Sequence, residues 1–192
     1  GDVSSLLSGA LLTCAFLGIL RAYQVLVAAG MRSFAADLLP VMGLLSMAGA
    51  AAFLVAQGDF KRLLAYSSVE HMGILAVGVG VGGGAAAGAM LHAVNHAFTK
   101  GMLFLLAGNI LVAYRSKSTL AVRGVGSALP ATGALWVAGL LAITGSPPFG
   151  TFLSELMIVK GAIDGDRPLV AGLFLLLLAV AFLGMARPML AM

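Results

Sequence analysis

Charged residues are scarce in this chain of 192 residues. Asp, Glu, Lys and Arg make up 9% of it, whereas an average soluble domain contains about 25%. Hydrophobic residues make up 61%, and the mean hydropathy is +1.08. A soluble domain of this size could not bury so much apolar surface, which excludes that class of protein. The composition predicts an all-α, polytopic membrane protein that lies in the lipid bilayer.

Cysteine is nearly absent, since Cys14 is the only one in the sequence. A single cysteine excludes an internal disulfide and says nothing about the compartment. The sequence also lacks a cysteine cluster, a nucleotide-binding loop and two histidines that could ligate haem from both sides. It therefore predicts no cofactor, no metal site and no redox centre in this chain. The net charge of +4 does not indicate nucleic acid, because the basic residues lie between apolar runs and form no single patch.

Long apolar runs make up most of the sequence. A bilayer core of about 30 Å needs roughly 20 helical residues at about 1.5 Å each. The runs predict about six membrane segments, at residues 5–29, 38–56, 63–81, 85–113, 131–163 and 169–186. Short polar or glycine-rich turns separate most of them, and the many small residues within them let membrane helices pack closely.

The loop charges predict how the segments cross the membrane. With six crossings, most basic loop residues fall on one side, namely Lys61, Arg62, Arg115, Lys117, Arg123 and Arg187. The other side has fewer basic residues, and acidic residues accompany them. Because Lys and Arg favour the cytoplasmic side, the first segment is predicted to start there.

The fifth segment, residues 131–163, is too long for one straight helix. As a single helix it would measure roughly 50 Å, well beyond the thickness of the bilayer. Residues 145–150 divide it with the sequence Gly-Ser-Pro-Pro-Phe-Gly, in which two prolines remove two backbone donors. We predict a helix broken inside the membrane, a feature that forms transport sites in other proteins. The alternative is a helix, a surface loop and an amphipathic helix.

Three proton-binding side chains share one face of the fourth segment. His92, His96 and Lys100 follow the spacing i, i+4, i+8, which turns about 80° around a helix and rises roughly 12 Å. Lys100 lies near the middle of the segment, where a charge costs at least ~2.5 kcal/mol on insertion scales. Neighbours about 6 Å apart can exchange protons through one water, which Asn95 and Thr99 could hold. The row therefore predicts a proton relay.

Three other interpretations of this row stay open. Two histidines at i, i+4 make half a zinc site, although no Glu follows the first one as in H-E-x-x-H. A haem is disfavoured, because histidines one turn apart on one helix cannot take opposite positions on one iron. The third interpretation is a polar cluster with a purely structural role.

Further ionisable residues occur in the third and fifth segments. Glu70 and His71 lie between apolar neighbours, with Tyr66 one turn earlier, so they are predicted to face the bundle interior. A position near the helix end is the alternative, because basic Lys61 lies about two turns away. Glu155 stands five residues beyond the break, in an otherwise apolar stretch.

Three motifs resemble those of a known protein family. The first, residues 59–73, reads Asp-Phe-Lys-Arg-Leu-Leu-Ala-Tyr-Ser-Ser-Val-Glu-His-Met-Gly and is similar to a hallmark of the antiporter-like membrane subunits of complex I. Relatives of those subunits include multisubunit sodium/proton antiporters and membrane-bound hydrogenases. The second, residues 92–105, resembles the central-lysine helix of the family, and the third, residues 145–150, its second broken helix. The sequence Ser-Val-Glu-His-Met-Gly at 68–73 is most similar to the hydrogenase-4 or formate hydrogenlyase branch.

The resemblance implies how the chain is organised. Complete family members have two inverted five-helix repeats, each with a broken helix. Residues 1–30 resemble the last helix of a truncated first repeat. Residues 31–192 resemble the whole second repeat, with five transmembrane helices of which the fourth is discontinuous. The chain opens at Gly1 and becomes apolar within a few residues, so we expect a piece of a longer protein.

The resemblance also implies a function. The chain would be a proton-translocating membrane subunit of a redox-driven complex of the NADH dehydrogenase or hydrogenase type. Lys100 would be the central relay, and Glu155 the terminal group near the periplasmic exit. The groups that connect or tune them would be His92, His96, Glu70 and His71.

The same resemblance implies partners and a location. The partners are other membrane subunits, a peripheral redox arm, and protons as the transported ion, and the location is the inner (plasma) membrane of a prokaryote. Two alternative functions stay open. One is a sodium/proton antiporter subunit, and the other is a non-conducting element for membrane packing or assembly.

Overall fold

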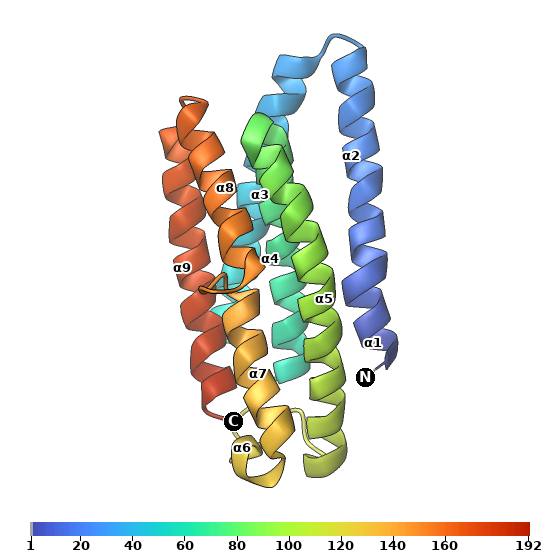
Figure 1. The fold of residues 1–192 in the computed structure, drawn as a ribbon, viewed down its shortest axis with the longest axis vertical. Coiled ribbons are helices and arrows are strands. Elements are labelled where there is room, and N and C mark those ends of the chain that lie inside the picture. Colours follow the sequence, from blue (N-terminus) through green and yellow to red (C-terminus); the bar gives the residue numbers. More distant parts are fainter. Residues whose placement is uncertain (1) are drawn as a thin grey trace.

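The computed structural model describes residues 2–192, which form a bundle of helices joined by short connections (Figure 1). The predicted all-α class is confirmed. The helices are α1 (Asp2–Leu6), a π-helical turn η1 (Leu7–Leu11), α2 (Leu12–Ala28), α3 (Arg32–Val55), α4 (Phe60–Val81), α5 (Gly83–Tyr114), α6 (Val125–Ala128), α7 (Pro130–Ile143), α8 (Gly150–Asp164) and α9 (Pro168–Leu190).

Five of the helical stretches are long and apolar enough to span a membrane. They are Val3–Ala28, Arg32–Val55, Phe60–Val81, Gly83–Tyr114 and Pro168–Leu190. The first runs through α1, η1 and α2 without a break. Together with the pair α7 and α8, they account for the six predicted segments. The helix that carries the predicted row of proton-binding residues, α5, is also the longest, at 32 residues.

The predicted break in the fifth segment is confirmed. Helix α7 ends at Ile143 and α8 begins at Gly150, and the two lie roughly end to end with the connection bulging to one side (Figure 1). The alternative of a surface loop followed by an amphipathic helix is wrong. Helix α8 packs closely against α5 and also contacts α9, so it is part of the bundle.

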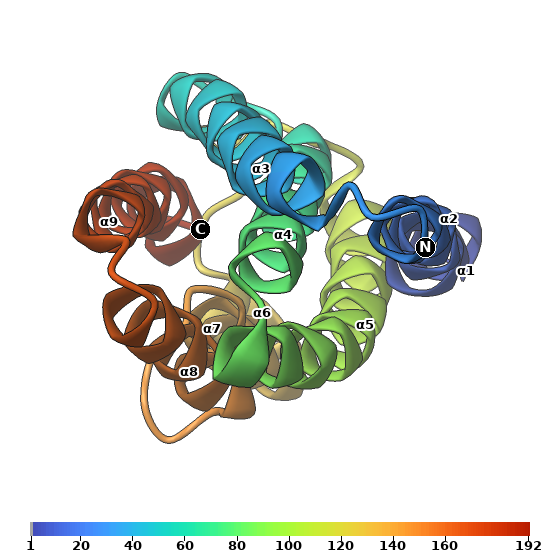
Figure 2. The same ribbon diagram turned by 90° about the horizontal axis from the view of Figure 1, so that it is seen from above.

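Helix α4 occupies the centre of the bundle, with α3, α5, α7, α8 and α9 around it (Figure 2). Small and apolar side chains on several sides of α4 let the neighbouring helices pack against it, so most of the helix is buried. Gly73 of α4 meets Gly43 of α3 so closely that a Cβ on Gly73 would lie 2.6 Å from the Gly43 carbonyl oxygen. The central helix therefore carries its polar residues into a space that lipid does not reach.

Six of the eleven basic residues lie at one end of the bundle, as the loop charges predicted. Both ends of the described chain and the connections α3–α4 and α5–α6 lie at this end (Figure 1). We call it the basic end, defined by Lys61, Arg62, Arg115, Lys117, Arg123 and Arg187. Here Asp59 caps α4, because its carboxylate accepts hydrogen bonds from the backbone N–H groups of Lys61 (2.8 Å) and Arg62 (3.1 Å).

The helix of the second segment extends beyond the predicted apolar run, which begins at residue 38. Helix α3 begins at Arg32, and its first turns include Asp37. Arg167, at the start of α9, donates to the Asp37 carboxylate (2.7 Å) and to the Ala36 carbonyl (2.8 Å). A polar helix end that a neighbouring arginine holds in place carries no hydrophobic pattern, so hydropathy alone could not include it.

Candidate functional site

The six predicted site residues all lie in the bundle interior. Helix α5 contributes His92, His96 and Lys100, each with 0% of its surface exposed. Helix α4 contributes Glu70 and His71, and α8 contributes Glu155, and these three are also buried. The alternative that placed the α4 pair near a helix end is therefore wrong. Three helices bring the ionisable side chains into one polar layer in the middle of the apolar bundle.

The centre of this layer is a hydrogen-bonded chain across three helices. His71 Nδ1 of α4 lies 2.8 Å from His92 Nε2 of α5, and the two rings stack with centroids 5.0 Å apart. His92 Nδ1 lies 2.8 Å from the hydroxyl of Ser154 on α8. The glycine surface of α5 permits this approach, because a Cβ on Gly88 would lie 2.9 Å from the Ser154 carbonyl oxygen. Both ring nitrogens of His92 thus take part in hydrogen bonds.

Lys100 points at the backbone of α4. Its ammonium group donates to the Leu64 carbonyl (2.6 Å) and to the hydroxyl of Ser67. Within residues 2–192, no carboxylate lies at ion-pair distance from this ammonium. Glu70 lies about one turn beyond Ser67 on α4. The lysine is therefore held by neutral acceptors.

A hydroxyl pair connects the Lys100 site to the basic end. Ser68 donates to the same Leu64 carbonyl (3.2 Å), and its hydroxyl lies 2.6 Å from that of Ser8 in η1. Both serines line a cavity of about 470 Å³ between the first long helix, α4 and α5. The charged residues around this cavity are Asp59, Lys61, Arg62 and Lys117. Polar groups thus extend from the charged surface to the acceptor of the buried lysine.

Glu155 lies at the break in the fifth segment. Its carboxylate rests against the backbone of Gly145, where a Cβ would lie 2.6 Å from the carboxyl carbon. Gly145 also has a φ of 64°, so glycine suits this position on two counts. The carboxylate lines a cavity of about 350 Å³ between α8 and α9, whose walls are mostly apolar. Its Oε1 atom is buried and has no protein partner among the described residues.

Several other polar atoms in the layer lack a protein partner in the part of the chain that the structure describes. They are Nε2 of His71, both ring nitrogens of His96, and the amide nitrogen of Asn95. The His96 ring lies 4.9 Å from the His71 ring, centroid to centroid. Buried polar atoms of this kind are usually satisfied by water. The arrangement suits a hydrated path between the histidines and the carboxyl group beside the break.

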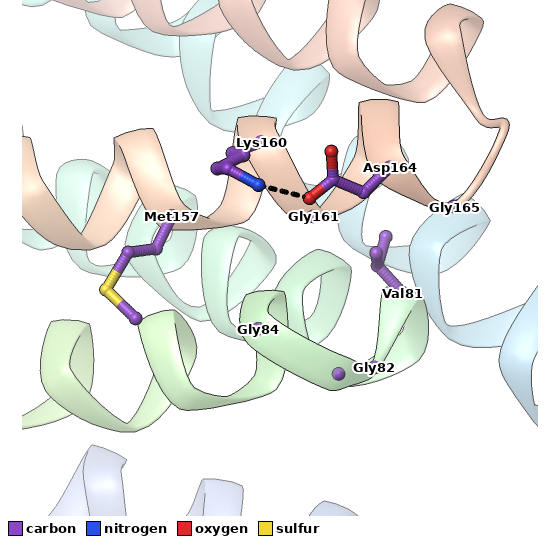
Figure 3. Close-up of a pocket in the computed structure, with 9 residues that line it drawn as sticks. Val81, Gly82, Gly84, Met157, Lys160, Gly161, Asp164 and Gly165 are labelled. Carbon is purple, nitrogen blue, oxygen red and sulfur yellow. Dashed lines mark hydrogen bonds and ion pairs between the residues drawn. The ribbon is translucent and has the colours of Figure 1, made fainter.

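A further cavity lies at the opposite end of the bundle, between the α4–α5 turn and the end of α8 (Figure 3). It measures about 380 Å³ and is lined by the glycines at 82–84. Lys160 and Asp164 form an exposed ion pair on its wall, with Nζ and Oδ2 2.5 Å apart. Exposed pairs of this kind contribute little stability. The cavity places polar side chains at the end of α8 that lies beyond Glu155.

Sequence reasoning missed the serines of the site. Ser67, Ser68 and Ser154 hold Lys100, its carbonyl partner and His92, yet serine is common in membrane helices and carries no distinctive pattern. Ser154 directly precedes Glu155, and Ser67 and Ser68 lie within the first resembling motif. Their positions beside ionisable residues in apolar helices could have indicated that they belong to the site.

Fold and site together define a multi-pass membrane protein with a broken helix beside a buried row of proton-binding groups. Residues 2–182 match the family described as NADH:quinone oxidoreductase/Mrp antiporter, TM. The chain belongs to this family, which confirms the resemblance found in its motifs.

Similarities to individual proteins are consistent with this family. The chain is 40% identical over 171 residues to a protein named hydrogenase-4 component F homolog from Methylacidiphilum infernorum, covering 88% of this chain and 36% of the relative. Its structure is similar to respiratory complex I from Thermus thermophilus with bound NADH, with a TM-score of 0.77 and 29% identity over 83% of this chain and 34% of that one. The archaeal membrane-bound sulfane sulfur reductase shares the fold, with a TM-score of 0.91 and 24% identity over 99% of this chain and 39% of that one. The chain therefore spans 34% to 39% of the length of these three proteins.

Proposed function

We propose that this chain is the second-repeat portion of a proton-translocating, antiporter-like membrane subunit in a redox-driven complex. The observation that carries the proposal is the buried layer of Lys100, three histidines and two carboxyl groups beside a broken helix. Ionisable groups are costly inside a membrane, and those that persist there usually mark an ion pathway. The names of the relatives, a hydrogenase-4 component and complex I, favour coupling to a redox reaction in partner subunits.

In the proposed mechanism Lys100 is the central relay. Its ammonium binds a carbonyl and a hydroxyl but forms no ion pair within the described residues. Changes in the charge of neighbouring groups therefore decide whether the lysine keeps its proton. A proton on Lys100 disfavours further positive charge on the histidines and favours ionisation of Glu70 and Glu155. Moving one proton thus drives the movement of the next.

The proposed route runs from the basic end to the break. Protons would approach through the cavity that contains Ser8 and Ser68, reach Lys100, pass the histidines and leave at Glu155. The excess of Lys and Arg supports a cytoplasmic location for the basic end. On that orientation, Glu155 serves the periplasmic side of a prokaryotic inner membrane. Other membrane subunits and a peripheral redox arm would complete the system.

The proposal includes the organisation of the chain. Residues 1–30 would be the last helix of a first repeat, and residues 31–192 the second repeat with its broken fourth helix. The share of the relatives that the chain covers supports a partial correspondence, since the chain covers 36% of one relative and 34% of one solved chain.

The uptake route gives a specific prediction. We expect Ser68→Ala in the full-length protein to slow proton uptake about 2- to 10-fold, because it removes a hydroxyl whose hydrogen bonds are worth about 0.5–1.5 kcal/mol. Ser68→Thr keeps the hydroxyl and should retain most of the rate. The measurement is proton uptake into inverted membrane vesicles. A full rate for Ser68→Ala would contradict a route through this serine.

The proposed function is tested by supplying an electron donor and a sodium gradient in separate experiments. Inverted vesicles that contain the full-length protein are given the electron donor of the complex in sodium-free buffer, and internal acidification is followed with a pH-sensitive dye. We expect acidification that vesicles lacking the protein do not show. Acidification changes that require a sodium gradient and no electron donor would identify a sodium/proton antiporter instead. Normal pumping without the protein would leave it a packing or assembly role.

A further inference from the structure

The hydroxyl of Ser154 has one hydrogen, and the groups around it assign where that hydrogen goes. Ser154 Oγ lies 2.7 Å from the carbonyl oxygen of Thr151, one turn earlier on α8. A carbonyl oxygen can only accept, so the serine donates to it. The serine oxygen is also 2.8 Å from His92 Nδ1. Because its only hydrogen is already used, Ser154 must accept in this second bond, and His92 Nδ1 must donate.

This assignment fixes the remaining bonds of the histidine pair. A neutral imidazole with its proton on Nδ1 has a lone pair on Nε2. Nε2 of His92 therefore accepts from Nδ1 of His71, 2.8 Å away, and His71 also carries its proton on Nδ1. Nε2 of His71 then carries a lone pair, and no described residue forms a hydrogen bond to it. The backbone of Ile143, at the end of α7, lies near the His71 ring and can accept a hydrogen bond from it once the ring is protonated. The chain of bonds points from the open nitrogen of His71 towards α8.

We propose that Ser154 is a positioning residue that holds the proton of His92 on Nδ1 and so makes Nε2 of His71 the acceptor of the histidine pair. This inference rests on the proposed proton-transfer function. The hydrogen bond that a second group makes to a histidine selects which ring nitrogen carries the proton, and Ser154 provides that bond here.

The assigned direction permits one defined transfer. An ammonium or hydronium group gives a proton to Nε2 of His71, which becomes a cation. The Nδ1 proton of His71 then moves to Nε2 of His92, so that His71 is neutral again, with its proton on Nε2. His92 now carries the positive charge, and its Nδ1 proton still points at Ser154. With the opposite tautomer on His92, Nε2 would carry a proton already and the transfer could not occur.

The position of Ser154 on the broken helix links the tautomer to the break. Thr151, whose carbonyl binds Ser154, donates its own hydroxyl to the carbonyl of Ala142 on α7. The first turn of α8 is thus attached to α7 through Thr151 and to α5 through Ser154 and His92. Any shift of α8 that separates Ser154 from His92 frees the imidazole to change its tautomer.

The test compares Ser154→Ala with Ser154→Thr in the full-length protein within its membrane complex. Infrared spectra of protein labelled with ¹³C-histidine distinguish the two neutral tautomers by their ring-stretching bands. Subtracting the spectrum of His92→Gln leaves the bands of His92 together with the change in its partner His71, and His71→Gln identifies the share of His71. We expect Ser154→Ala to lose the Nδ1–H band of His92 and to slow proton transport about 2- to 10-fold, the rate equivalent of one lost hydrogen bond. Ser154→Thr should restore both.

The control is Ser46→Ala, which removes another serine–carbonyl bond, to Val69 across α3 and α4, in which no histidine takes part. It should change neither the band nor the rate. An unchanged Nδ1–H band in Ser154→Ala would overturn the assignment. A lost band with a normal rate, in a protein that Lys100→Met inactivates, would overturn the role of Ser154 in transfer and leave the proposed function standing. Failure of the proposed function itself would show as normal transport in Lys100→Met, whereas the band tests the assignment without transport.

Discussion

Replacing Lys100 with methionine is expected to lower donor-driven proton transport by about 100-fold or more, the range typical of losing a group that accepts and returns a proton. The lysine side chain is fully buried, and methionine fills nearly the same volume without a titratable group. The fold should therefore persist while the relay loses its central member. Alanine at this position should have the same effect on transport, at an additional cost in stability from the cavity it leaves.

A second replacement separates proton exchange from the mere presence of charge. Arginine keeps a positive charge at this site but does not release its proton in proteins. We expect Lys100→Arg to fail in transport as Lys100→Met does. If a fixed charge sufficed, Lys100→Arg would pump and Lys100→Met would not.

The control for both variants is Lys160→Met, which removes the exposed lysine of the ion pair at the far end of α8. It should transport normally, since exposed pairs contribute little. Assembly of the complex is checked on native gels before transport is measured in inverted vesicles. Normal transport by an assembled Lys100→Met complex would remove this lysine from the mechanism.

The row on α5 shows that residue spacing within one helix can predict which side chains are buried together. Spacing placed His92, His96 and Lys100 on one face, and the structure buries that face completely. Periodicity within one helix suffices for this prediction, because side chains at i, i+4 and i+8 must share a side. The break at 145–150 could also be predicted, because two prolines and two glycines disfavour a continuous helix there.

Partnerships between helices could not be predicted in the same way. The row suggested exchange between His92 and His96, yet His92 bonds to His71, 21 positions away, and to Ser154, 62 positions away. These pairs depend on how closely α4, α5 and α8 approach, which the glycines set through backbone packing. A single sequence indicates that such helices can pack closely, but it does not give the register of one helix against the next. The acceptors of Lys100 were hidden for the same reason, since one of them is a backbone carbonyl.

Glu155→Gln should also reduce proton transport by about 100-fold, with assembly intact. Glutamine has almost the shape of glutamate, so it fits the space against Gly145, where the carboxyl group leaves no room for a Cβ. It cannot hold and release a proton, however, and the relay would lose the group that we place at its exit. Protons would then reach Lys100 and the histidines but would have no group on α8 to accept them. The measurement is donor-driven acidification of inverted vesicles.

The chain offers a matched control on the same helix. Asp164→Asn makes the same change from acid to amide at an exposed position, nine residues further along α8, and should leave transport unchanged. Glu155→Asp keeps the carboxyl group but withdraws it by one methylene from Gly145, so we expect a loss between those of the other two variants. If Glu155→Gln pumps as fast as Asp164→Asn, the proton leaves by another path. In that case the cavity between α8 and α9 would have no part in release, because Glu155 is the ionisable residue that lines it.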